Sequence, residues 1–304
     1  MRFQLYRTWG RHQFRTPRGR VVGSGVATTM TVDLPPSSFA ATMSTSTTSA
    51  TNPKGPRVYL PGTTPGAWAT TYLGSTVGHK VMTALTGLGL AGFVVFHMIG
   101  NLKLLPGGPE SREAINAYAA FLKHDLGLLL WIARGGLLVI FVLHVATALR
   151  LKSKSATARP VPYYHQRTAQ AGLASRTMLS TGLVILAFVL FHMAHYTFAW
   201  VHPVQAPDGT WTNYLALIDE KGRHDVYAMM VAGFSTPWIA VLYLVAQAVI
   251  AVHLSHGIRS SLQTLGLVGR RFSLVARWLG YAVALTVLAG NSAIVLAVWA
   301  GIVR

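Results

Sequence analysis

Long apolar stretches recur along this chain, and each exceeds the roughly 18 residues that an α-helix needs to cross the hydrocarbon layer of a membrane. They cover approximately residues 79–100, 127–150, 176–201, 236–259 and 276–303. Lipid cannot hydrogen-bond to the backbone, so such stretches must satisfy their peptide groups within a helix. The sequence therefore predicts an all-α integral membrane bundle of five transmembrane helices over residues 73–304.

Composition agrees with a lipid environment. Charged residues make up 11% of the chain, far below the roughly 25% of ordinary soluble domains. The net charge of +18 comes from Lys and Arg in the N-terminal tail and in alternate loops, which favours membrane lipid over nucleic acid as the partner. Cysteine is absent, which excludes disulfides, Cys-ligated iron–sulfur clusters and thioether-bound haem in this chain. Any metal must be held by His, Met or oxygen ligands.

Residues 1–72 differ from the rest. They are rich in Ser, Thr, Gly, Pro and Ala, contain one acidic residue, Asp33, and show no sustained apolar period, so we expect a disordered N-terminal extension. The Arg-rich start allows two interpretations: a transit peptide, or a true translation start at Met43. The Arg-rich start has no apolar core of a secretory signal. Of the two interpretations we favour the start at Met43.

The segments between the apolar stretches alternate in charge. Acidic residues lie only between the first and second stretches and between the third and fourth, whereas the other two connections carry Lys and Arg without any acid. Because positive loops stay in the cytoplasm, the N-terminus is expected inside and the C-terminus outside.

Six histidines lie within the apolar stretches, where ionisable residues are rare and usually functional. They are His97, His144, His192, His195, His253 and His256. At about 1.5 Å per residue, His97 and His192 lie about 27 Å and 24 Å from the inner edge of the membrane. By the same rise His144 and His253 lie about 9 Å from that edge. One pair of histidines is therefore expected near each face.

Two such pairs, contributed by different helices, match the needs of two b-type haems, each held by one imidazole from either side. The His192/His195 and His253/His256 spacings would also suit zinc, but no carboxylate or Cys accompanies them. The second His of each pair then binds a propionate or a quinone, or packs at an interface; alternatively, it is the haem ligand and its neighbour is not. Depth alone leaves this open.

Other residues of the spans have two interpretations each. Arg134, at the outer end of the second span, is a candidate partner for a haem propionate, or it extends to the membrane interface. Glycines at positions 87, 89, 92, 135 and 136 allow close helix packing, and they also leave room beside the backbone for a flat macrocycle.

Taken together, these residues resemble a known family, the single-chain, five-helix, di-haem cytochrome b anchor of succinate dehydrogenases and fumarate reductases. The resemblance covers about residues 73–304. It is carried by the segments STVGHK (75–80), FHMIGNL (96–102), NAYAAFL (116–122), LHV (143–145), FHMAHYT (191–197) with HP (202–203), DVYAMMVAGF (225–234), HLSHG (253–257) and SLQTLGL (261–267).

The resemblance implies that His97 and His192 ligate an outer haem and that His144 and His253 ligate an inner one. It also implies two partners in a bacterial plasma membrane, a flavoprotein subunit that oxidises succinate and an iron–sulfur subunit on the cytoplasmic face. This chain would be their electron-transfer and anchor subunit, and it would pass electrons to a membrane quinone, with menaquinone expected. Candidate quinone contacts are Asn101, Tyr118 and His195 near the outer haem, and Ser75, His79 and Lys80 near the inner face.

Two other functions share some of these features. A di-haem cytochrome b of a formate dehydrogenase or hydrogenase would have the same buried histidine pairs but a different dehydrogenase partner. A cofactor-free transporter could use the histidines as proton relays, yet we find neither internal repeats nor interrupted helices in the sequence. The spans also contain no dinucleotide fingerprint, phosphate loop or nucleophile elbow, so succinate chemistry is expected on a partner subunit.

Overall fold

The computed structural model describes residues 65–158, 172–201, 203–205, 208–269 and 271–304. The expected start at Met43 and the extension up to residue 64 lie outside the described residues, as do Arg159, Arg167 and His202.

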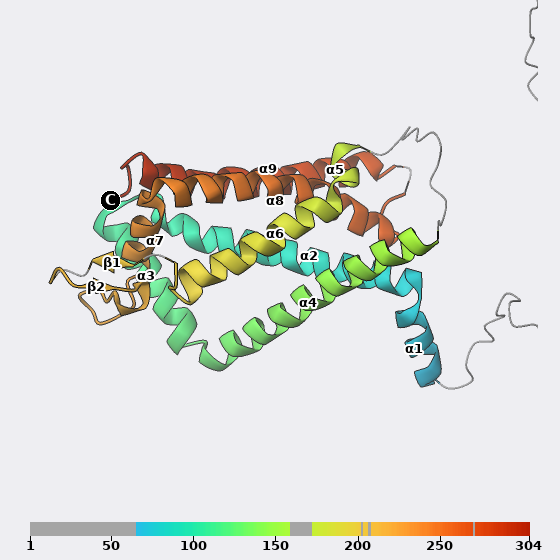
Figure 1. Ribbon diagram of the computed structural model, residues 1–304, viewed down its shortest axis with the longest axis horizontal. Helices are drawn as coiled ribbons and strands as arrows, with labels where there is room; N and C mark the ends of the chain where they lie inside the picture. Colours follow the sequence, from blue (N-terminus) through green and yellow to red (C-terminus); the bar gives the residue numbers. More distant parts are fainter. Residues whose placement is uncertain (1–64, 159–171, 202, 206–207, 270) are drawn as a thin grey trace, which may run out of the picture. The chain divides into compact units, whose positions relative to one another are not determined.

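Five long helices run side by side (Figure 1). They are α2 (Thr76–Asn101), α4 (Gly127–Thr157), α6 (Met178–His192), α8 (Pro237–Thr264) and α9 (Ser273–Trp299). A π-helical turn, η2 (Met193–Thr197), extends α6 without a break. Each of the five is long and apolar enough to cross a membrane, which confirms the prediction of five apolar helices.

Several helix ends differ from the predicted spans, most of all that of α4, which continues from the expected residue 150 to Thr157. The fourth helix continues beyond Arg259 to Thr264, because a helix can extend past the hydrocarbon layer with its charged side chains in water. The third span was expected to reach residue 201 but ends at Thr197. Its last turn is a π-helix, and Ala199 then takes a left-handed backbone conformation with φ of 52°.

Shorter elements gather at the two ends of the bundle (Figure 1). One end holds η1 (Leu102–Leu104), α3 (Gly108–His124), β1 (Val204–Gln205), β2 (Trp211–Thr212), η3 (Tyr214–Ala216) and α7 (Val226–Ser235), with β1 and β2 paired antiparallel. The other end holds α1 (Pro65–Gly74) and α5 (Leu173–Arg176).

Residues 65–72 depart from the expected disordered extension, because they form most of α1. Proline at the first helical position is pre-organised for a helix. Trp68 and Tyr72, one turn apart, stack with ring centroids 5.6 Å apart, and Thr71 donates a hydrogen bond to the carbonyl of Ala67 over 2.8 Å. These local contacts favour a short helix, and the composition of the segment does not reveal them.

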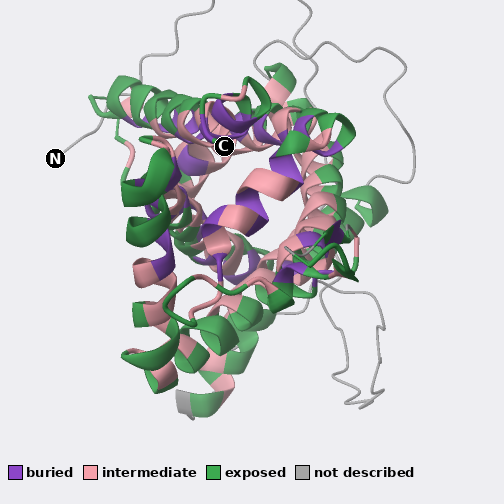
Figure 2. Cartoon of the chain, turned by 90° about the vertical axis from the view of Figure 1, so that its left-hand side faces the viewer, coloured by how far each residue is buried: buried purple, intermediate pink, exposed green. Residues whose placement is uncertain are grey.

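Helix packing is uneven. The backbones of α8 and α9 approach so closely that a Cβ at Gly280 would lie 2.7 Å from the carbonyl oxygen of Ser255. Gln247 accepts a hydrogen bond from Asn291 over 3.0 Å and so joins the same two helices. By contrast, α4 buries a single residue, Thr147. Figure 2 shows buried residues mainly on the parts of the helices that face the interior of the bundle, and exposed residues mainly on the outer parts.

The two ends of the bundle differ in charge. We call the end with α3 and α7 the acidic end, because all described acidic residues lie there: Glu110, Glu113, Asp125, Asp208, Asp219, Glu220 and Asp225. We call the other the basic end. It carries Lys80, Arg150, Lys152, Lys154, Arg176, Arg259, Arg271 and Arg277, and the described residues there include no acid.

Candidate functional site

The histidine pair nearer the acidic end comes from α2 and α6. The ring centroids of His97 and His192 lie 5.9 Å apart, with the ring planes at 86° to each other. Two imidazoles that share one metal through bonds of about 2.0 Å place their centroids roughly 6 Å apart. The spacing of this pair therefore suits two axial ligands of a single metal.

A chain of hydrogen bonds leads from this pair toward the acidic end. Nδ1 of His192 lies 3.1 Å from the hydroxyl of Tyr243, and the same hydroxyl lies 3.0 Å from Nδ1 of His195. Nε2 of His195 lies 3.2 Å from the hydroxyl of Tyr214 on η3. His195 and Tyr214 are fully buried. Burial raises the pKa of Tyr214, so its hydroxyl stays protonated and available for hydrogen bonding.

The second pair lies toward the basic end and comes from α4 and α8. Nδ1 of His144 lies 3.2 Å from the carbonyl oxygen of Thr83 and 3.3 Å from the hydroxyl of Thr86. Nδ1 of His253 lies 3.1 Å from the hydroxyl of Thr181.

Glycines of α2 and α6 receive the rings of the second pair. A Cβ at Gly87 would lie 2.9 Å from Cε1 of His144, and a Cβ at Gly182 would lie 3.5 Å from Cε1 of His253. Each of these glycines lies ten residues before the histidine of the first pair on its own helix. Ten residues rise by about 15 Å, so both helices separate the two pairs by the same distance.

A histidine that binds haem iron has a characteristic set of contacts. A ligating histidine usually binds the metal through one ring nitrogen and donates the other N–H to an oxygen. His144, His192 and His253 each have Nδ1 beside an oxygen, while Nε2 makes no hydrogen bond within the described residues. Three of the four expected ligands therefore fit.

The fourth, His97, differs. Its Nε2 lies 3.2 Å from the amide nitrogen of Asn101, one turn later on α2. Coordination through Nε2 requires that this amide turns aside. Asn101 is only half-buried at the end of α2, so such a rotation meets little resistance.

The remaining predicted site residues lie as follows. His195 has both ring nitrogens hydrogen-bonded to tyrosine hydroxyls, so it is less suited to ligation than His192. His256 is half-buried on α8, one turn after His253. Arg134 is exposed on α4, with its guanidinium 5.1 Å from the ring centre of Trp131. A propionate contact by Arg134 stays a prediction.

Three of the candidate quinone contacts have a local structural role. Ser75 caps α2 by accepting a hydrogen bond from the amide of Gly78, and Nδ1 of His79 lies 2.7 Å from the carbonyl of Ser75. Tyr118 of α3 packs against Gly100, where an added Cβ would lie 2.9 Å from its ring.

The glycines of the spans divide between the two interpretations. Gly87 and Gly89 face side chains of α4, because an added Cβ would lie 2.9 Å from His144 and 3.3 Å from Ile140. Gly92, Gly135 and Gly136 have no such neighbour within 4 Å. Close packing therefore applies to the first two.

Several site residues escaped the sequence analysis. Tyr243, Thr83 and Thr181 hold the imidazoles, and the hydroxyl of Tyr196 is buried beside His195 without a hydrogen-bond partner among the described residues. The repeated ten-residue spacing from Gly87 and Gly182 to histidine was a usable signal. The tyrosines gave none, because their contacts join distant parts of the chain.

A network of ion pairs and hydrogen bonds joins α3 to the start of α7 at the acidic end. Asp225 caps α7, accepts hydrogen bonds from Asn116 over 3.0 Å and from Nε of Arg112 over 3.0 Å, and forms an ion pair with Arg112. Burial would raise the pKa of Asp225, but these hydrogen bonds outweigh it and hold the pKa below its ordinary value. Burial and the hydrogen bonds from Arg223 compete likewise at Asp219, whose pKa falls to about 2. Both carboxylates therefore stay charged at neutral pH.

Comparisons with protein-family models, with curated proteins and with solved structures found no match. Within the described residues, no group of three or more His, Cys, Asp or Glu side chains could hold a metal ion. A b-type haem would need only two histidines from the protein for its iron, so a cluster of three or more such side chains is not required for haem binding.

Proposed function

We propose that this chain is the membrane-anchor cytochrome b of a succinate:quinone oxidoreductase. In this role it carries electrons from an iron–sulfur subunit through two b-type haems to a membrane quinone, with menaquinone expected. The observation that supports the proposal is the close approach of the His97 and His192 rings at one level of the bundle, with the His144 and His253 rings against glycines at the other. Three of these four histidines have Nδ1 beside an oxygen and an Nε2 without a hydrogen bond in the described residues. The resemblance in sequence supplies the identity of the dehydrogenase.

The protein residues would each have a definite task. Ligation through Nε2 requires a proton on Nδ1, so His144 would donate to the carbonyl of Thr83, and His253 to the hydroxyl of Thr181. That hydroxyl itself donates to the carbonyl of Thr177 over 2.9 Å, so it is oriented to accept. When bound at each pair, a b-type haem supplies one-electron transfer.

At the level of His97 and His192, donors and acceptors would form one continuous chain of hydrogen bonds. His192 would donate from Nδ1 to Tyr243, Tyr243 would donate to Nδ1 of His195, and His195 would donate from Nε2 to Tyr214. These bonds fix the orientation of the His192 ring and raise its basicity as a ligand. His195 would then act on the outer haem through Tyr243 rather than as a ligand.

The charge asymmetry supports an orientation and a partner. We place the basic end in the cytoplasm of a bacterium, with the iron–sulfur and flavoprotein subunits on it, since basic loops remain inside and suit an acidic partner. The quinone would be reduced within the membrane. Succinate oxidation would take place on the flavoprotein.

The direct test is a reduced-minus-oxidised spectrum of the purified protein, together with identification of the subunits that co-purify. Two b-type haems with a flavoprotein and an iron–sulfur protein are expected. The absence of a b-haem band would refute the proposal. Co-purification with a formate dehydrogenase or hydrogenase would leave the haem sites in place and change the enzyme.

A second test concerns the ligand pairs. His144→Ala or His253→Ala should remove the haem nearer the basic end, and His97→Ala or His192→Ala the other one, because each iron loses an axial imidazole. His256→Ala is the matched control and should keep both haems. Loss of the same spectral component in the His97 and His253 variants would contradict the pairing.

A further inference from the structure

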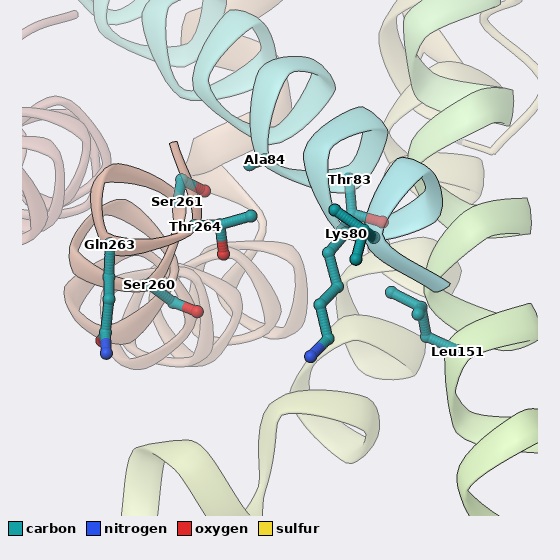
Figure 3. A pocket seen from close by; sticks show the side chains of 9 residues that line it. Lys80, Thr83, Ala84, Leu151, Ser260, Ser261, Gln263 and Thr264 are labelled. Carbon is teal, nitrogen blue, oxygen red and sulfur yellow. The ribbon is translucent and has the colours of Figure 1, made fainter. Parts of the chain in front are cut away.

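A cavity of about 510 Å³ lies at the basic end between α2, α4 and α8. Its polar lining consists of Lys80, Thr83, Ser260, Ser261, Gln263 and Thr264. Figure 3 shows Lys80 from α2 opposite Ser260 and Thr264 from α8, with the open space between them. The cavity thus combines one cation with several neutral hydrogen-bonding groups.

Lys80 has no counterion within the described residues. Every described acidic side chain lies at the acidic end, the length of the bundle away. The three N–H donors of its ammonium group are best satisfied by an anion, because charge-assisted hydrogen bonds are about twice as strong as neutral ones.

The hydroxyls that α8 contributes to the cavity are also uncommitted, whereas that of Thr83 donates to Thr147. Elsewhere in the bundle, threonine hydroxyls donate to the carbonyl one turn earlier, as Thr86 does to Met82 over 2.7 Å and Thr147 to Leu143 over 2.7 Å. Within the described residues, no hydrogen bond joins the side chains of Ser260, Ser261 or Thr264 to another group. Donors are therefore available on the wall that faces Lys80.

The cavity adjoins the second histidine pair. Thr83 lines the cavity and offers its carbonyl to Nδ1 of His144. The hydroxyl of Ser261 would lie 3.9 Å from a Cβ at Gly87, the residue that receives the ring of His144. A ligand beside this pair can therefore reach the cavity with an acidic substituent.

We propose that this cavity binds an anionic oxygen group, a carboxylate or a phosphate, with Lys80 as its charge partner and the hydroxyls of α8 as donors. Two sources carry that chemistry at this place, a propionate of the inner haem and the headgroup of an anionic lipid. The propionate source rests on the function proposed above, whereas the lipid source does not.

The test uses the full-length protein as isolated from membranes, in three variants. Lys80→Gln removes the charge, Lys80→Arg keeps it, and Lys152→Gln removes an exposed charge of α4 that does not line the cavity. Native mass spectrometry measures retention of phosphatidylglycerol against phosphatidylcholine, and redox titration measures the midpoint potential of each haem. Ser261→Ala with Thr264→Val tests the hydroxyls separately.

For a lipid, Lys80→Gln should bind phosphatidylglycerol about fivefold more weakly than Lys152→Gln, with unchanged potentials. For a propionate, it should instead lower the potential of the inner haem alone, because loss of a nearby positive charge favours ferric iron. Lys80→Arg should restore either property. If Lys80→Gln matches Lys152→Gln in both measurements, the proposal is overturned. If the wild type holds no haem, the proposed function fails, and lipid retention alone then decides the proposal.

Discussion

Replacement of Gly87 by alanine tests how the second histidine pair is built. The added Cβ would lie 2.9 Å from Cε1 and 3.3 Å from Nδ1 of His144. Carbon atoms pack best at about 3.5–4.0 Å, so the ring must retreat by roughly 0.6–1.1 Å. That movement weakens the hydrogen bond from Nδ1 to the carbonyl of Thr83 and displaces Nε2 from its position.

The loss of stability in Gly87→Ala is measured against a matched control variant. Gly92, on the same helix, has no neighbour within 4 Å of an added Cβ. Both alanine variants gain the same helix propensity, about 1 kcal/mol. The difference between them therefore isolates the overpacking at His144, for which we expect about 1–3 kcal/mol.

Two assays measure this difference. Unfolding in mixed micelles gives the free energy of unfolding of each variant, and the haem content with the redox spectrum reports on the site itself. Gly87→Ala should be the less stable variant and should lose or perturb the haem nearer the basic end, while Gly92→Ala keeps both. Equal stability within about 0.5 kcal/mol and two unperturbed haems in both variants would refute the reasoning.

Two further predictions concern the acidic end. Tyr243→Phe removes the hydroxyl between His192 and His195, so this variant should keep both haems but shift the midpoint potential and the electron-paramagnetic-resonance signal of the outer haem. His195→Ala should shift both in the same direction. Loss of a haem in the His195 variant would instead make His195 the ligand. The pKa of Asp219 is lowered from 3.8 to about 2, so its contribution to stability is present above pH ~4 and is lost as pH falls toward 2. Hydrogen exchange in residues 208–225 should therefore accelerate over that pH range. Asp219→Asn should reduce this pH dependence of hydrogen exchange.

The five apolar helices could be predicted because lipid leaves a long apolar segment no alternative to a helix. The depth of each histidine followed for a related reason, since the rise per residue is constant along a helix. Depth arguments placed His97 with His192, and the structure brings these two rings together. Their role as haem ligands stays a prediction.

Rotation about the helix axes could not be predicted in the same way. The partner of His192 is Tyr243, 51 residues away, and the partner of His253 is Thr181, 72 residues away. Such contacts depend on which face each helix turns to its neighbour, and strongly apolar helices carry little amphipathic pattern to reveal it. The π-helical turn at the end of α6 adds a residue to one turn, which changes the direction of every later side chain.

The small number of buried residues in α4 has a consequence for assembly in the membrane. This helix contributes His144, yet it buries only Thr147 and is joined to α2 by the hydrogen bonds of Thr83 with Thr147, over 2.8 Å, and with His144. Membrane helices insert first and associate afterwards, and those with few interior contacts associate weakly. Among the five long helices, α4 and α6 bury the fewest residues, Thr147 alone and none. In a newly inserted chain we therefore expect these two helices to separate sideways into lipid most easily. A chain whose α4 has come away exposes polar threonines and a histidine to hydrocarbon, which costs free energy and favours the return of α4 to the bundle.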